Sequence, residues 1–112
     1  MSKNENLHLL DGRQIDYTYD GGWRFKVQFE NGLAAYQFMG DEGESVSNSN
    51  KDIPYQSRLV RDDLYHVMWH EQDIGDLVSL VIDFKENRIF SAALLGYREN
   101  DFMLHFEGGD LH

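Results

Sequence analysis

The sequence predicts a single all-β domain, an eight-stranded antiparallel barrel whose strands follow one another in an up-and-down meander. Short segments alternate between apolar and polar residues, which is the pattern of half-buried strands. Most of the links between them are short and rich in Gly, Asn and Asp, as in hairpin turns. The 112 residues suit one domain, 1–112, and closure of the sheet into a barrel would hide its edges.

The chain opens with a polar lead-in, 1–14, whose few leucines we expect at one end of the fold. Two alternating runs follow at 15–19 and 23–30, joined by an Asp-Gly-Gly turn. Their apolar faces carry Ile15, Tyr17 and Tyr19 on the first run and Trp23, Phe25, Val27 and Phe29 on the second. These faces are therefore predicted to point into the barrel.

A third strand is predicted over 32–40, with Tyr36 on its apolar face. Residues 41–52 contain almost nothing apolar, and we interpret them as a flexible acidic loop near the mouth of the barrel. Extended character returns at 53–61.

The fifth strand, 64–71, alternates most clearly and places Tyr65, Val67, Trp69 and Glu71 on the inner face. The last strands are expected at 77–84, 88–97 and 101–107. Because 77–84 and 89–95 carry apolar residues on both faces, we expect the outer surface there to be covered by a second copy in a homodimer.

The composition excludes several classes of protein. With 20 acidic and 10 basic side chains the net charge is −10, so nucleic acid and anionic membrane surfaces are unlikely partners. The absence of Cys excludes disulfides and thiolate metal sites. The sequence carries neither an apolar run of membrane-spanning length nor a signal peptide pattern, which leads us to expect a cytoplasmic protein.

The candidate chemistry involves Tyr17, Tyr19 and Glu71. Two phenol hydroxyls separated by one residue can jointly donate hydrogen bonds to a carboxylate or an oxyanion. A carboxyl group shielded by aromatic rings is suited to proton transfer, so these three residues are the candidate catalytic groups. The candidate ligand-binding residues are Tyr17, Tyr19, Phe25, Val27, Tyr36, Tyr65, Val67, Trp69 and Glu71. No cofactor fingerprint is present, and we expect no metal, because His66 and His70 lie too far apart along one strand to share an ion.

Two stretches give the chain a family resemblance. The run 17–23 (YTYDGGW) followed by 65–71 (YHVMWHE) resembles the bacterial phenolic acid decarboxylases, which are lipocalin-like barrels of the calycin group. The segments 53–55 (IPY), 60–65 (VRDDLY) and 75–83 (GDLVSLVID) resemble the related MoaF-like domains. The decarboxylase resemblance implies that Tyr17 and Tyr19 orient a substrate carboxylate and that Glu71 transfers protons. The MoaF-like resemblance implies no particular reaction.

Two functions follow as hypotheses. The first is a MoaF-like, lipocalin-type barrel that binds a small aromatic or amphipathic molecule in its interior. The alternative is a cofactor-free lyase or isomerase, similar to phenolic acid decarboxylase, that acts on a small phenolic or carboxylate substrate with Glu71 as acid and base. The decarboxylase resemblance also implies an arginine in the segment before the fourth strand, but 44–51 (ESVSNSNK) contains none. Lys51 lacks the planar fork of a guanidinium group, so we favour binding.

Overall fold

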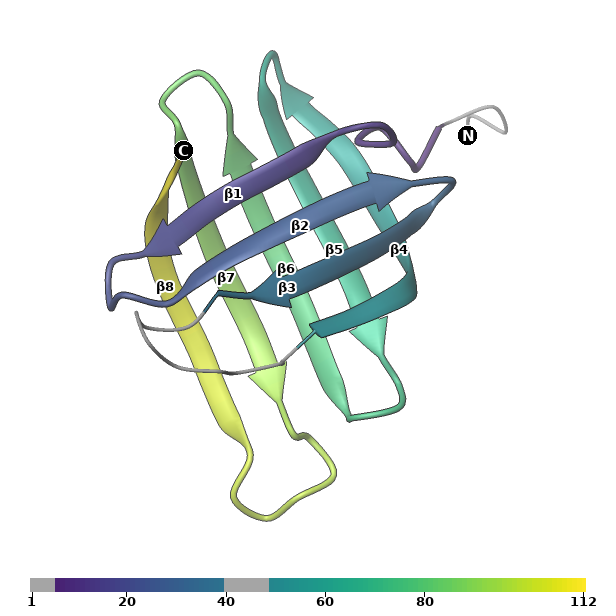
Figure 1. Cartoon of the computed structure of the whole chain (residues 1–112), viewed down its shortest axis with the longest axis vertical. Helices are drawn as coiled ribbons and strands as arrows, with labels where there is room; N and C mark the ends of the chain where they lie inside the picture. Colours follow the sequence, from purple (N-terminus) through teal and green to yellow (C-terminus); the bar gives the residue numbers. More distant parts are fainter. Residues whose placement is uncertain (1–5, 40–48) are drawn as a thin grey trace.

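The eight predicted strands close into one antiparallel barrel. A computed structural model describes residues 6–39 and 49–112. Each strand pairs with the next, and the last pairs with the first, so the up-and-down meander is confirmed (Figure 1). The strands are β1 (Gln14–Tyr19), β2 (Arg24–Glu30), β3 (Leu33–Phe38), β4 (Ser49–Arg61), β5 (Leu64–Glu71), β6 (Asp76–Asp83), β7 (Arg88–Leu95) and β8 (Met103–Leu111).

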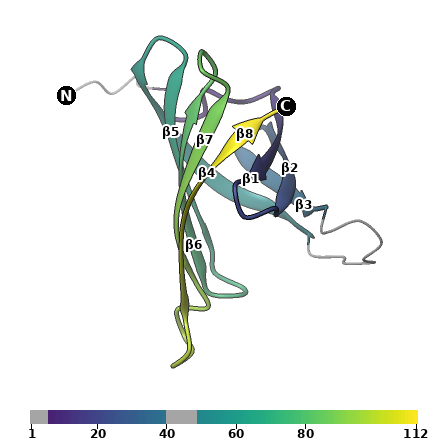
Figure 2. The same ribbon diagram turned by 90° about the vertical axis from the view of Figure 1, so that its left-hand side faces the viewer.

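The barrel is flattened into two layers. Strands β1 to β3 cross over β5 to β8, and β5 to β8 continue well past the crossing (Figures 1 and 2). β4 joins the layers, because its first residues pair with β3 and the residues from Tyr55 onward pair with β5. The register with β3 shifts between Asn50 and Ile53, where Asp52 adopts a φ of 58°, and this bulge lets the 13-residue strand bend from one layer to the other.

The start of β4 corrects the predicted loop. Residues 49–52 belong to the strand, so their assignment to a flexible acidic loop was wrong, whereas 41–48 lie outside the described residues. Ser49 and Asn50 pair with Gln37 and Tyr36 of β3. The backbone ladder therefore includes residues that have no apolar alternation to reveal them.

A seam of only three residue pairs, between β1 and β8, closes the barrel. The last strand was predicted to end at Glu107, but it continues through two glycines to Leu111. A Cβ on Gly109 would lie 2.4 Å from the carbonyl oxygen of Thr18 and 2.8 Å from the Cα of Tyr19. Gly109 is therefore required for close backbone approach at the seam.

Side chains fill one end of the barrel. The fully buried residues there include Leu10, Phe29, Tyr55, Val67 and Ile82. The lead-in is tied to this end, since Ser57 Oγ accepts from the Leu9 amide and donates to the Leu7 carbonyl oxygen, each at 2.9 Å. The remaining space inside the barrel lies toward the opposite end.

The outer face of β5 to β8 carries exposed apolar side chains. Phe106 is 87% exposed and aligns across the sheet with Ala92, Ser79 and Met68. The neighbouring row contains Leu77, Leu94 and Leu104. This surface matches the one expected to form a homodimer, which stays a prediction. In the part of the chain that the structure describes, no helix has the length and apolar character to cross a membrane.

Candidate functional site

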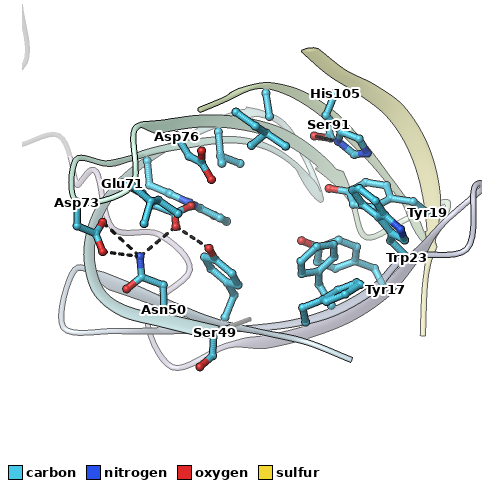
Figure 3. Close-up of a pocket in the computed structure, with 18 residues that line it drawn as sticks. Tyr17, Tyr19, Trp23, Ser49, Asn50, Glu71, Asp73, Asp76, Ser91 and His105 are labelled. Atoms are coloured by element: carbon cyan, nitrogen blue, oxygen red, sulfur yellow. Dashed lines mark hydrogen bonds between the residues drawn. The ribbon is translucent and has the colours of Figure 1, made fainter. Parts of the chain in front are cut away.

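A cavity of about 420 Å³ occupies the unfilled end of the barrel, between the two layers (Figure 3). Its volume lies within the range of ligand pockets, roughly 300–1,000 Å³. The described residues that line it are Tyr17, Tyr19, Trp23, Phe25, Tyr36, Phe38, Ser49, Asn50, Trp69, Glu71, Asp73, Ile74, Asp76, Val78, Ser91, Ala93, Leu95 and His105.

Glu71 is the buried carboxylate of the cavity wall, only 2% exposed. Its Oε1 accepts from the Tyr36 hydroxyl at 2.6 Å and from Asn50 Nδ2 at 3.0 Å, and its Oε2 accepts from Trp69 Nε1 at 3.0 Å. A carboxylate has about four lone-pair sites, so three donors leave one acceptor site, on Oε2. Such donors take the place of water around an ionised carboxylate.

Burial raises the pKa of Tyr36 well above its ordinary value. The hydrogen bond to Glu71 and the negative charge of that carboxylate raise it further. Tyr36 therefore remains a protonated donor throughout the physiological pH range.

Local structure gathers two further carboxylates beside Glu71. A tight turn follows β5, in which the Gly75 amide donates to the Glu71 carbonyl oxygen at 2.8 Å and Gly75 adopts a φ of 75°. This turn brings Asp73 and Asp76 to the same wall, and the Asp76 carboxylate accepts from the Gly96 amide. No Lys or Arg occurs among the described lining residues, although Arg98 donates to the Gln72 carbonyl oxygen in the same turn.

Tyr17 and Tyr19 lie on the opposite side of the cavity from Glu71 (Figure 3). Their rings meet edge to face at 5.2 Å between centroids. Burial raises the pKa of Tyr17 well above its ordinary value, and the neighbouring Tyr19 adds to this effect. Burial also raises the pKa of Tyr19, partly offset by hydrogen bonds with Ser91 and Tyr17. Both phenols therefore stay protonated and can donate to a bound group.

Near the two tyrosines, a series of hydrogen bonds connects side chains of β7 and β8. Ser91 Oγ lies 3.0 Å from His105 Nδ1, and His105 Nε2 lies 2.9 Å from Glu107 Oε1. The Gly21 amide donates to the other oxygen of Glu107. The His105 ring also stacks on Trp23, with 5.8 Å between centroids. Packing and hydrogen bonds therefore fix the position of the His105 ring.

The structure separates the predicted site residues into two levels of the barrel. Tyr17, Tyr19, Phe25, Tyr36, Trp69 and Glu71 line the cavity. Val27 and Val67 also face inward, but they lie in the filled core. Tyr65 packs against Phe84, with the Arg13 guanidinium over its ring, and does not line the cavity. Alternation identifies the inner face of a strand, but it does not give a residue's height along the barrel.

Sequence reasoning missed Asn50, Asp73, Asp76, Ser91 and His105. Ser91 lies on the inward face of a strand, where a polar residue between Ile89 and Ala93 was an available signal. Asn50 had none, because it lay within the segment interpreted as a loop. Across the described ranges, no group of three or more His, Cys, Asp or Glu side chains is arranged to hold a metal ion.

Comparison with known proteins places this barrel in a family. The model of the MoaF-like family matches residues 11–108, which is most of the chain. The chain belongs to the MoaF-like family. Curated protein sequences contain no match to it. Among solved structures, a protein from Burkholderia vietnamiensis provisionally described as a beta-lactamase superposes with a TM-score of 0.77 at 17% sequence identity, over 96% of this MoaF-like chain and 98% of that one. At this identity the likeness shows the fold alone.

Proposed function

We propose that this MoaF-like barrel binds, in its interior, a small aromatic molecule that carries a positive charge. The observation that carries the proposal is the chemistry of the cavity wall. Seven aromatic residues and three carboxylates line a space of about 420 Å³, and none of the described lining residues is Lys or Arg.

The aromatic walls would accept the apolar part of such a ligand. Trp23, Phe25, Phe38 and Trp69 supply flat surfaces, and a cation over the face of an aromatic ring gains about 0.5–2 kcal/mol. The rings pack against one another, for example Phe25 against Phe38 at 5.0 Å between centroids, so the walls are largely formed before a ligand enters. A preformed pocket lowers the entropic cost of binding.

Glu71 would anchor the charged group. Its remaining acceptor site on Oε2 suits an ammonium donor, and Asp73 and Asp76 add negative potential on the same wall. A carboxylate ligand would meet three like charges there. Tyr17 and Tyr19, as protonated donors, would hold a hydroxyl or carbonyl oxygen at the opposite end of the ligand.

The alternative is a cofactor-free lyase or isomerase with Glu71 as acid and base. The burial of a carboxylate in the cavity wall favours this reading. Against it, both oxygens of Glu71 already accept hydrogen bonds, and the acidic wall would repel an acid substrate. Binding is therefore the better supported function.

The test compares three probes of one shape: 3-phenylpropylamine, 3-phenylpropan-1-ol and 3-phenylpropanoate. We expect calorimetry to show the affinity order amine, alcohol, acid. Glu71→Gln should weaken amine binding by roughly 10- to 100-fold, as expected for a charged hydrogen bond, and leave the alcohol nearly unchanged. Arg58→Gln, on the exposed outer side of β4, is the matched control. Tighter binding of the acid than of the amine would contradict the proposal, and conversion of any probe that disappears in Glu71→Gln would favour the enzyme.

A further inference from the structure

The Ser91, His105 and Glu107 chain has the connectivity of an activated nucleophile. Ser91 lines the cavity from β7, while His105 and Glu107 lie two residues apart on β8. The strand register pairs Ser91 with Glu107 and Ala93 with His105, which brings the three side chains together on the inner side of the sheet. A nucleophile, a base and a group that orients the base are the three parts that acyl-transfer sites require.

The hydrogen bonds determine which nitrogen of His105 carries the proton. An ionised carboxylate only accepts hydrogen bonds, so the His105 Nε2 that faces Glu107 must carry a hydrogen. In the neutral ring, Nδ1 is then unprotonated and accepts from the Ser91 hydroxyl. In this arrangement the imidazole can take the hydroxyl proton when Ser91 attacks a substrate.

A second serine and histidine pair in the same barrel lacks these features. His66 Nε2 lies 3.0 Å from Ser79 Oγ on the outer face of β5 and β6. Among the described residues, neither His66 nor Ser79 lines the cavity, and no carboxylate is hydrogen-bonded to His66. Ser91 differs from Ser79 in having a cavity in front of it and an oriented base behind it.

We infer that Ser91 is the nucleophile of an acyl-transfer site that hydrolyses small carboxylic esters with an aromatic group. His105 acts as the general base and acid, and Glu107 is a positioning residue. The aromatic walls and the volume of about 420 Å³ set the substrate class. The Tyr17 and Tyr19 hydroxyls, which stay protonated and line the same cavity as Ser91, are the donors for the negative oxygen that develops during attack.

The reaction balances with water as the co-reactant. Ser91 Oγ bonds to the ester carbonyl carbon, His105 Nδ1 takes the hydroxyl proton, and the carbonyl electron pair moves to oxygen. The bond from that carbon to the alkoxy oxygen then breaks, and His105 returns the proton to the leaving alcohol. Water attacks the acyl group in the same way, and the bond to Ser91 Oγ breaks to release the acid and restore the serine.

The test uses the full chain with phenylmethanesulfonyl fluoride, a neutral aromatic probe whose sulfur bonds to a reactive serine oxygen as fluoride leaves. Mass spectrometry of the intact protein and its peptides is expected to show one adduct, on Ser91. Ser91→Ala should abolish the adduct, and Ser79→Ala should leave its rate unchanged. His105→Gln should slow labelling by roughly 10²- to 10⁴-fold, as expected for loss of a general base. No adduct on Ser91, or equal labelling in Ser91→Ala, would overturn the inference.

A second measurement covers the case in which Ser91→Ala does not fold. The chain has no Cys, so Ser91→Cys and Ser79→Cys each introduce a single thiol. A base at hydrogen-bond distance raises the thiolate fraction. We expect iodoacetamide to alkylate Ser91→Cys faster than Ser79→Cys, and an added Glu107→Gln to slow only the former. If Ser91→Cys is alkylated at the same rate with and without Glu107→Gln, the proposed roles of His105 and Glu107 are overturned. Because these probes are uncharged, their failure is separable from failure of the cationic-ligand proposal.

Discussion

Replacement of Glu71 by Leu tests whether the stability of the barrel depends on the carboxylate that accepts three hydrogen bonds. Burial alone suggests that an ionised group is a burden on stability, and that an apolar side chain of similar size would relieve it. The structure argues the opposite sign, because Tyr36, Asn50 and Trp69 all direct hydrogen atoms at Glu71. The Trp69 bond is buried, so its N–H has no water to turn to when the carboxylate is removed.

The magnitude follows from the donors left without partners. A buried unsatisfied donor costs about 1–3 kcal/mol, and the Trp69 N–H contributes this amount in Glu71→Leu. Tyr36 and Asn50 line the cavity and can reach water, so they add little. In Glu71→Gln, the amide oxygen remains for Trp69, and the Tyr36 hydroxyl can rotate to accept from the new NH2 group, but Asn50 loses its acceptor on this side chain. We therefore expect Glu71→Gln to lose less stability, about 0.5–1.5 kcal/mol, the size of one net hydrogen bond.

Urea unfolding followed by tryptophan fluorescence measures both variants, with the slope of the transition checking that the two-state reading holds. The control is Asp73→Asn, an exposed carboxylate of the same wall, which should change the free energy of unfolding by less than about 0.5 kcal/mol. If Glu71→Leu is as stable as the wild-type protein, the donors do not depend on the carboxylate and the reasoning fails.

Three further outcomes are expected. Gly109→Ala should destabilise the domain by about 1–3 kcal/mol through overpacking against the β1 backbone. In Gly108→Ala the new Cβ meets the flexible end of Arg88 and the Phe90 ring, so chemical denaturation should show a smaller loss of stability for this variant. The hydrogen bond from Arg24 lowers the pKa of Asp16 in the folded protein. Wild type should therefore be more stable than Arg24→Gln above the ordinary Asp pKa of 3.8, and melting curves should show this difference fade as the pH falls through the lower folded pKa. The exposed face around Phe106 predicts a dimer by light scattering and a monomer for Phe106→Glu, and a monomeric wild-type protein would contradict it.

Part of the candidate site was predictable because it depends on alternation within single strands. The inward direction of Tyr17, Tyr19, Trp69 and Glu71 follows from period two, and each side chain is buried in the structure. The barrel was predicted from alternation, short turns and the need to hide the sheet edges, and the closed eight-stranded sheet confirms it. The turns at Asp20 to Gly22 and Asn31 to Gly32 follow from residues that adopt positive φ at low cost.

The tertiary structure alone decided which inward residues share one space. Val27 and Tyr36 pair directly across β2 and β3, yet Val27 is packed in the core and Tyr36 reaches Glu71, a difference that no local pattern contains. Ser91 meets His105 because of the β7 and β8 register, and Glu71 finds Asn50 because β4 starts earlier than its polar sequence suggests. Strand direction is a property of neighbouring residues in the chain. Register and the level of a side chain along the barrel depend on how all eight strands close together, so only the closed sheet determines them.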